Sequence, residues 1–359
     1  MHFHTLTVTD VRRETPDTVS IAFDVPEQLK DEYSFKQGQY LTLRTKISGE
    51  EIRRSYSICS GVDEPGLRVA VKHVPGGRFS TFANQRLSPG DTLDVMTPSG
   101  RFTSPIDPET GKTYVAFAAG SGITPIMSII KTVLNREPNS QFILFYGNRT
   151  TGSIIFREQL QDLKNMYLRR LAVFNILSRE NQDIDLFTGH IDEEKAATLL
   201  STFCHVDRID EAFVCGPNTM IDNVAAALED MGVRRDKIHY ERFTSGASED
   251  RGAAEARARA RVEAKSHESF VRVSVDGAVT EFNMPFDGET ILDGAIKAGA
   301  DIPYSCKGGM CCTCRSKVMK GRVDMALNYA LEADEVENGY ILTCQSRPLT
   351  EEVEIDFDM

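Results

Sequence analysis

The sequence predicts a multidomain protein with three folded parts in a row: an antiparallel β-barrel, an α/β domain with a parallel sheet, and a small α+β domain of the β-grasp type. The chain has 359 residues, which is too long for one ordinary core. The spacing of apolar residues changes along the chain, and a stretch with few large apolar side chains precedes the last part. We expect the segment boundaries at 1–106, 107–243, 244–268 and 269–359.

Short β-strands are expected throughout residues 1–106. Segments such as "TVSIAFDV", "QYLTLRTKI" and "LRVAVKHV" are rich in β-branched residues, alternate in polarity and are separated by Gly, Pro and Asp. This pattern is typical of antiparallel strands. A closed or nearly closed barrel is the natural packing for them.

Residues 107–243 alternate buried strands with helices. "YVAFAAG" is followed by a glycine turn and "PIMSIIKTVLN", and "AFVCGP" is followed by "TMIDNVAAALEDMG". Strands that alternate with helical patterns form βαβ units. We therefore expect a parallel sheet with helices on both faces.

The last two segments differ sharply in composition. Residues 244–268 consist mainly of Ala and charged residues, so they cannot bury a core, and we expect a flexible linker. In residues 269–359, "FVRVSVDG" and "TEFNMPF" indicate a hairpin and "ETILDGAIKAG" a helix, a cysteine-rich loop follows, and "EVEIDF" indicates a closing strand. This order favours a small mixed sheet around one helix.

Composition limits the classes of function. Hydrophobic residues make up 41% of the chain and charged residues 26%, which is the balance of a globular protein. The formal net charge of -12 argues against general affinity for nucleic acid or anionic membrane, because both favour basic surfaces. The sequence shows no signal peptide and no long apolar run, so we expect a cytoplasmic protein. Clustered cysteines in that compartment are more often ligands than disulfides.

Four of the eight cysteines lie in "YSCKGGMCCTCRSK", residues 304–317. Cys306, Cys311 and Cys314 have the spacing C-x4-C-x2-C, and Cys344 follows in "ILTCQS". This is the plant-type spacing for a 2Fe-2S cluster. A zinc site and idle buried thiols are the alternatives, but zinc sites usually pair two C-x2-C knuckles. We treat Cys312 as a small residue that is not a ligand.

A second candidate site lies in the predicted barrel. "RRSYSICS" supplies Arg54, Tyr56 and Ser57, which are suited to a phosphate, a flat ring and a polar ring edge, respectively. In "GGRFST", Gly77 and Ser80 form a turn that can present amides and a hydroxyl to a pyrophosphate at a helix start. Together the two motifs indicate a flavin dinucleotide, although "RSYS" alone also fits an ordinary strand.

Two glycine turns follow buried strands of the predicted parallel sheet. "AAGSGITPI" and "FVCGPNTMI" each lie between a strand and a helix, where a backbone turn can approach a phosphate closely. The first lacks the G-x-G-x-x-G pattern, so a purely structural turn is the alternative. Cys215 in the second is either a site residue or a small core residue.

With these motifs in place, the chain resembles the ferredoxin-NADP reductase superfamily, and specifically reductases that carry a fused plant-type ferredoxin at the carboxyl end. The resemblance covers nearly the whole chain outside residues 244–268. More narrowly, "YSCKGGMCCTCRSKV", "NYAL", "ILTCQSRP" and "FHTLTV" are similar to segments of the reductase subunits of phenylacetyl-CoA epoxidase complexes.

The resemblance implies a role for each matching residue. It places Tyr56 against the flavin ring, Ser57 near its N5, and Phe243 over the ring with Glu241 nearby; a core aromatic is the alternative for Phe243. The residues implied as catalytic are Tyr56, Ser57, Cys215, Glu241 and Phe243. The residues implied on the flavin side are Arg54, Tyr56, Ser57, Val71, Lys72, Gly76, Gly77, Arg78, Phe79, Ser80 and Phe243. The residues implied on the nicotinamide side are Gly120, Ser121, Gly122, Ile123, Thr124, Pro125, Cys215, Gly216 and Pro217.

The nicotinamide cofactor is expected to be NADPH, with NADH as the alternative. The resemblance places Ser178 and Arg179 of "ILSRE" where NADP-specific relatives hold the 2'-phosphate, and Arg suits that charge. The basic and aromatic partner that plant members place a few residues later is not evident in "NQDIDLFTG". An exposed Ser-Arg pair without a role is the competing interpretation.

The expected activity is electron transfer from NADPH through FAD and a 2Fe-2S cluster to the subunits of a di-iron oxygenase, with a phenylacetyl-CoA epoxidase as the leading candidate. The alternatives are an NADH-dependent reductase of another oxygenase or of a hybrid-cluster protein, and a redox-sensing interaction protein. Residues 269–359 hold eight Lys/Arg and sixteen Asp/Glu. An acidic domain on a linker suggests docking on a basic partner, although acidic surfaces also serve solubility.

Overall fold

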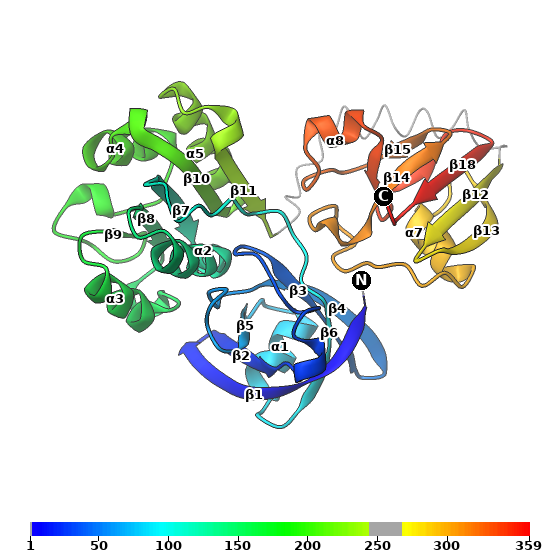
Figure 1. Ribbon diagram of the computed structural model, residues 1–359, viewed down its shortest axis with the longest axis horizontal. Helices are drawn as coiled ribbons and strands as arrows, with labels where there is room; N and C mark the ends of the chain where they lie inside the picture. Colours follow the sequence, from blue (N-terminus) through cyan, green and yellow to red (C-terminus); the bar gives the residue numbers. More distant parts are fainter. Residues whose placement is uncertain (1, 244–267) are drawn as a thin grey trace. The chain divides into compact units, whose positions relative to one another are not determined.

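The computed structural model describes residues 2–243 and 268–359 (Figure 1). The chain divides into two compact units, Met1–Phe243 and Thr244–Met359. The predicted linker lies outside the described residues except for Glu268, which begins a strand. In the described ranges, none of the helices is both long enough and apolar enough to span a bilayer.

The first part of unit 1 is a curled antiparallel sheet, as predicted. Its strands are β1 (Phe3–Thr15), β2 (Thr18–Asp24), β3 (Tyr40–Ile47), β4 (Glu50–Ser57), β5 (Leu67–Lys72) and β6 (Thr92–Met96). They pair in the order β4-β3-β6-β1-β2-β5. A bridge between Ile58 and Val69 joins the two outer strands and closes the sheet.

The inside of this barrel is apolar. Leu6, Ile21 and Leu43 are buried side chains of three different strands, as expected when alternate residues of each strand point inward. Helix α1 (Arg78–Gln85) packs Phe79 and Ala83 into the same core. The turn that precedes α1 is therefore fixed to the barrel.

The second part of unit 1 is a parallel sheet with helices on both faces, also as predicted. Its strands β7 (Thr113–Ala119), β8 (Gln141–Asn148), β9 (Leu171–Leu177), β10 (Ile209–Gly216) and β11 (Ile238–Arg242) pair in the order β11-β10-β7-β8-β9. Helices α2 (Ile123–Arg136) and α3 (Arg157–Met166) share a core on one face. Helices α4 (Glu193–Phe203) and α5 (Asn218–Asp230) share a core on the other. Neither α4 nor β11 was predicted as an element from the sequence.

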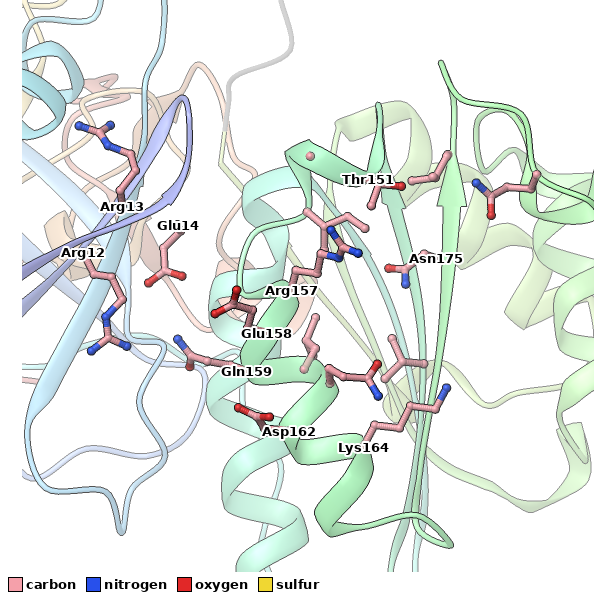
Figure 2. A pocket seen from close by; sticks show the side chains of 17 residues that line it. Arg12, Arg13, Glu14, Thr151, Arg157, Glu158, Gln159, Asp162, Lys164 and Asn175 are labelled. Atoms are coloured by element: carbon pink, nitrogen blue, oxygen red, sulfur yellow. The ribbon is translucent and has the colours of Figure 1, made fainter.

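A cleft of about 940 Å³ lies beside α3 (Figure 2). Arg12 and Arg13 of β1 line one side of it, and Glu158 and Asp162 of α3 carry opposite charges toward that side. The described residues that line the cleft include none of the predicted site residues. The cleft nevertheless borders the predicted nicotinamide side, because Leu177, which directly precedes Ser178, lines it.

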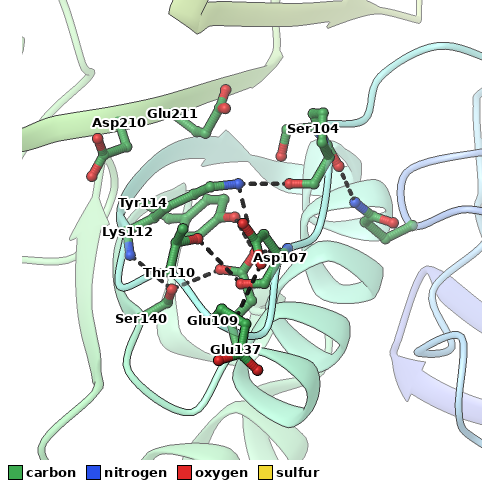
Figure 3. Close-up of polar contacts among 12 residues, drawn as sticks. Ser104, Asp107, Glu109, Thr110, Lys112, Tyr114, Glu137, Ser140, Asp210 and Glu211 are labelled. Carbon is green, nitrogen blue, oxygen red and sulfur yellow. Dashed lines mark hydrogen bonds and ion pairs between the residues drawn. The ribbon is translucent and has the colours of Figure 1, made fainter.

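A buried carboxylate fixes the segment that connects the barrel to the parallel sheet (Figure 3). Glu137, which follows α2, is fully buried. It accepts hydrogen bonds from the Asp107 amide at 2.8 Å, the Tyr114 hydroxyl at 3.1 Å and the Ser140 hydroxyl at 2.6 Å. The Lys112 ammonium lies 3.6 Å from the same carboxylate. These contacts satisfy a charge that would otherwise be costly to bury.

Unit 2 is a small mixed sheet with one main helix, which agrees with the predicted β-grasp. Strands β12 (Glu268–Val275), β13 (Ala278–Pro285), β14 (Arg315–Lys320), β16 (Tyr340–Leu342) and β18 (Glu352–Asp356) pair in the order β13-β12-β18-β14-β16. Strands β15 (Val323–Met325) and β17 (Ser346–Pro348) form a separate pair. Helix α7 (Ile291–Lys297) packs against the main sheet, and α8 (Ala333–Glu337) precedes β16.

We predict that Glu137→Leu lowers the free energy of unfolding of the full chain by about 2 to 4 kcal/mol, because three donors, two of them in buried hydrogen bonds, lose their acceptor. Glu137→Gln keeps one acceptor oxygen and is expected to cost less. Urea unfolding measures both values. Glu109→Gln, an exposed change in the same connector, is the control, and an equal effect of Glu109→Gln and Glu137→Leu would contradict this account.

Candidate functional site

The predicted flavin residues lie at the end of β4. Arg54 is exposed, and its guanidinium donates to the Arg53 carbonyl at 2.7 Å. The Tyr56 ring lies 5.4 Å from the ring of Phe79, and burial raises the pKa of the Tyr56 hydroxyl. Ser57 is buried. The strand thus presents a cation, an aromatic ring and a hydroxyl within four residues.

The turn before α1 has the backbone geometry that its glycines predict. Gly76 has φ +75°, a conformation that favours glycine. A Cβ on Gly77 would lie 2.6 Å from the Ser80 hydroxyl, and that hydroxyl accepts from the Val74 amide at 3.1 Å. Ser80 therefore shapes the turn, which opens at the amino end of α1. A helix start with a glycine turn suits a pyrophosphate, so the residues fit a bound FAD.

The remaining residues implied on the flavin side have different environments. The side chains of Val71 and Phe79 are buried in the barrel core, and the Val71 carbonyl accepts from Asn84 at 3.0 Å. Arg78 pairs with Glu50. The Lys72 ammonium lies 3.9 Å from the Cβ position of Gly120, which places Lys72 beside the first glycine turn of the parallel sheet.

The two glycine turns of the parallel sheet contact each other. A Cβ on Gly122 would lie 2.0 Å from the Cys215 carbonyl oxygen, and one on Gly216 would lie 3.2 Å from the Ala119 amide. Gly120 has φ +53°. Only a backbone without side chains permits this approach, so the residues fit a dinucleotide that is bound through backbone groups.

The remaining residues of these turns begin the two helices. The Thr124 hydroxyl donates to the Ser121 carbonyl at 2.9 Å, while Ile123 and Pro125 are buried in the first turn of α2. Pro217 directly precedes α5.

Three of the residues implied as catalytic come together although they are far apart in sequence. The Ser57 hydroxyl donates to the Glu241 carboxylate at 3.2 Å. Cys215 pairs with Glu241 across β10 and β11, and burial raises the pKa of the Cys215 thiol. Burial also raises the pKa of Glu241 to about 8, against the lowering effect of Ser57. A carboxyl that titrates near neutral pH beside a hydroxyl can exchange a proton.

Phe243 directly follows β11 and is 39% exposed. It is therefore not the core aromatic of the alternative interpretation. Its role over a flavin stays a prediction.

A basic pair lies where strands β8 and β9 end. The Ser178 and Arg179 amides donate to the carbonyls of Asn148 and Arg149 at 2.9 and 2.8 Å. Arg149 and Arg179 are exposed, and among residues 2–243 and 268–359 neither guanidinium has a hydrogen-bond or ion-pair partner. Arg149 was not predicted from the sequence. Its position directly after a predicted strand is the signal, because carboxyl ends of neighbouring parallel strands meet at one edge.

Glu180, the acidic residue of the same segment, is already hydrogen-bonded within the protein. Glu180 accepts from the Thr151 amide at 2.7 Å and from the Thr151 hydroxyl at 2.6 Å. The hydroxyl and the amide lower the pKa of Glu180. Its two oxygens are therefore directed toward Thr151, which leaves the two guanidinium groups available to an anion.

The cysteine loop brings its thiols together in two pairs. The Cys306 thiol interacts with the Cys311 thiol, and the Cys314 thiol with the Cys344 thiol. The amides of Gly308 and Cys311 donate to the Cys306 sulfur at 3.3 and 3.4 Å. The Cys311 thiol, together with backbone amides, lowers the pKa of Cys306 to about 5.

This donor set fits a two-iron cluster. In the part of the chain that the structure describes, no three His, Cys, Asp or Glu side chains, those of the four cysteines included, are already arranged around one point as a metal site. The two thiol pairs provide two ligands for each iron of a 2Fe-2S cluster, and the amides are the donors that such sulfurs need. Cys312 donates to the Ala330 carbonyl at 3.3 Å, so it points away from these ligands.

Comparisons with known protein families match all three parts. Residues 5–104 match the oxidoreductase FAD-binding domain, residues 117–226 the oxidoreductase NAD-binding domain, and residues 273–349 the 2Fe-2S iron-sulfur cluster binding domain. One component of the 1,2-phenylacetyl-CoA epoxidase of Escherichia coli K12 is 46% identical over 356 residues, which cover 99% of this chain and 98% of that protein.

The chain belongs to the ferredoxin-NADP reductase superfamily, in the branch with a carboxyl-terminal 2Fe-2S domain. Another member, the ferredoxin reductase component of 3-ketosteroid-9-alpha-monooxygenase from Rhodococcus rhodochrous, is 35% identical and covers 98% of this chain and 96% of its own. The solved structure of phthalate dioxygenase reductase has the same fold, with a TM-score of 0.59, 22% identity and coverage of 99% of this chain and 98% of its own. As a member of this superfamily, the chain is an oxidoreductase with FAD-binding, NAD-binding and 2Fe-2S domains.

We predict that the pH dependence of stability changes in Glu241→Gln. The folded state holds the Glu241 proton more tightly than the unfolded state does, since the pKa is about 8 rather than the ordinary 4.5. Protonated Glu241 therefore contributes its full share to the free energy of unfolding below about pH 4.5, and this share is lost as pH rises toward 8. Urea unfolding at about pH 5, 7 and 9 should show that the free energy of unfolding falls less with rising pH in Glu241→Gln than in the wild type.

Ser57→Ala is the matched control for this measurement. It keeps the carboxyl but removes the hydrogen bond that lowers its pKa, so the decline with pH should persist and extend to higher pH. Equal declines in the wild type and Glu241→Gln would contradict the assignment of this titration to Glu241.

Proposed function

We propose that this chain is the NADPH-dependent reductase of a di-iron oxygenase that epoxidises the ring of phenylacetyl-CoA. The choice of acceptor rests on one observation, the identity of 46% over nearly the full length of the E. coli epoxidase component. Bound together, FAD and a 2Fe-2S cluster would supply the conversion of a hydride into single electrons. The acidic composition of residues 269–359 supports an encounter with a basic surface of the oxygenase.

The residues at the β4 and β11 ends would bind and orient the cofactors. Tyr56 would offer its ring as a flat wall, and the glycine turns at Gly122 and Gly216 would bring backbone groups close to the dinucleotide. Ser57 and Glu241 would hold a proton in a partly buried hydrogen bond next to the reacting rings. Positioning of this kind is the main contribution that a protein makes to cofactor chemistry.

NADPH rather than NADH is supported by the two strand-end arginines. A 2'-phosphate is an anion that Arg recognises through paired N-H donors, and both Arg149 and Arg179 have exposed guanidinium groups. The Ser178 hydroxyl lies in the same segment. Glu180, which would repel a phosphate, is held by Thr151.

Other interpretations of the chain have less support. A reductase for a different oxygenase is favoured by the 35% identity with the 3-ketosteroid monooxygenase component, which is lower than that with the epoxidase component. A redox-sensing protein would need no hydride path. A sensory function therefore gives no reason for the hydrogen bond between Ser57 and Glu241.

We predict that Arg179→Ala and Arg149→Ala each raise the KM for NADPH by about tenfold or more, because each removes a charge-assisted hydrogen bond of about 1.5 to 3 kcal/mol. The KM for NADH should stay within about twofold. Steady-state reduction of an artificial one-electron acceptor gives both values. Arg169→Ala removes the same charge at the opposite end of β9 and should change neither. An unchanged ratio of the two KM values in the strand-end variants would contradict the phosphate role.

The acceptor is tested by coupled turnover. NADPH-driven oxygenation of phenylacetyl-CoA by the purified oxygenase subunits should require this protein, and product analysis with and without it is the measurement. Absence of product, while the same preparation rapidly reduces an artificial acceptor, would contradict this acceptor and leave the reductase assignment intact.

A further inference from the structure

A buried amide side chain connects the two halves of the cysteine loop. Gln345, between β16 and β17, directly follows the ligand Cys344 and is only 9% exposed. Its Nε2 donates to the Lys307 carbonyl at 2.9 Å and to the Cys344 sulfur at 3.7 Å. Lys307 directly follows Cys306, so one side chain contacts the sulfur of one thiol pair and the backbone next to the other.

The partners of the amide determine its orientation. A backbone carbonyl can only accept a hydrogen bond, so the Gln345 atom that faces Lys307 must be the NH2 group. The same group has a second N-H, and the Cys344 sulfur lies within its reach. An ionised sulfur is an acceptor as well. Both N-H donors of Gln345 are thus used at the cluster loop.

The backbone of the loop is shaped around this side chain. Lys307 has φ +51°, an uncommon conformation for a residue with a side chain, and Gln345 holds its carbonyl. Gly309 has φ +73°, and a Cβ there would lie 3.3 Å from Cγ of Gln345 and 2.9 Å from the Leu327 carbonyl.

Backbone hydrogen bonds tie Gln345 and the loop to one further segment. The Ala326 amide donates to the Gln345 carbonyl at 2.8 Å, and the Tyr329 amide donates to the Gly309 carbonyl at 3.0 Å. Gln345 and the cysteine loop are therefore both anchored to residues 326–329.

We propose that Gln345 is a positioning residue that joins the two ligand pairs and tunes the cluster through its hydrogen bond to the Cys344 sulfur. A donor to a ligand sulfur stabilises the more negatively charged, reduced cluster and so raises its midpoint potential. The inference rests on cluster binding by residues 273–349 and not on the identity of the electron acceptor.

The test uses the full chain with its cluster loaded. Gln345→Leu removes both donors, and Gln345→Glu keeps the shape but replaces the donor with an acceptor. Midpoint potentials come from anaerobic titration with dithionite and redox dyes, EPR spectra report the ligand environment, and iron content reports loading. Both variants should have a more negative potential and altered EPR g values.

Thr343→Val is the matched control. Thr343 flanks Cys344 on the other side and is fully buried, but its hydroxyl donates to the Cys314 carbonyl at 3.1 Å and not to a sulfur. The potential and the g values of this variant should stay those of the wild type.

Each further outcome decides the question. A wild-type potential in a loaded Gln345 variant would overturn the proposal. If both Gln345 variants failed to load iron while Thr343→Val loaded it, the result would support the role of Gln345 in joining the two ligand pairs. Thr343 is more buried than Gln345, so general damage to the core beside Cys344 would affect Thr343→Val at least as much. Equal loss of loading in all three variants would overturn the assignment to Gln345, because any change beside Cys344 would then have the same effect. Reduction with dithionite keeps these results independent of NADPH and of the oxygenase.

Discussion

The backbone contact between the two glycine turns of the parallel sheet is the constraint on which the nicotinamide side of unit 1 depends. The Cβ position of Gly122 lies 2.0 Å from the Cys215 carbonyl, so helices α2 and α5 can start side by side only if Gly122 has no side chain. The parallel pairing of β10 with β11 places Cys215 beside Glu241, and Glu241 accepts a hydrogen bond from Ser57 of the barrel. The glycine turns and the Ser57–Glu241 hydrogen bond thus lie at the same end of the parallel sheet.

Two carboxyl groups, Glu137, which is fully buried, and Glu241, which is half-buried, show how environment separates structural from chemical roles. Glu137 accepts three hydrogen bonds and lies near Lys112, so its charge is compensated and it holds the connector between the two parts of unit 1. Glu241 has the hydrogen bond from Ser57, and burial raises its pKa to about 8. The first group is suited to stability and the second to proton exchange.

Local pattern was sufficient to predict the three architectures, the glycine turns and the cysteine loop, because strand periodicity, turn residues and ligand spacing are all short-range signals. Contacts between distant segments were not accessible in this way. Arg149, Glu137 and Gln345 acquire their partners through the register of neighbouring strands or through a loop that returns from elsewhere. Helix α4 was missed because its sequence, "EEKAATLLSTF", falls between the motifs that guided the prediction, and the short strand β11 was recognised only as the segment that ends in "ERF".

The central claim is that one chain holds a complete path from nicotinamide to cluster. Its most direct test is anaerobic reduction of the fully loaded chain with NADPH, followed by flavin absorbance and by EPR of the cluster. The account predicts flavin bleaching together with the EPR signal of a reduced 2Fe-2S cluster, and flavin bleaching alone in Cys306→Ser. A cluster that dithionite reduces but NADPH does not, in a chain whose flavin is fully bleached, would contradict it.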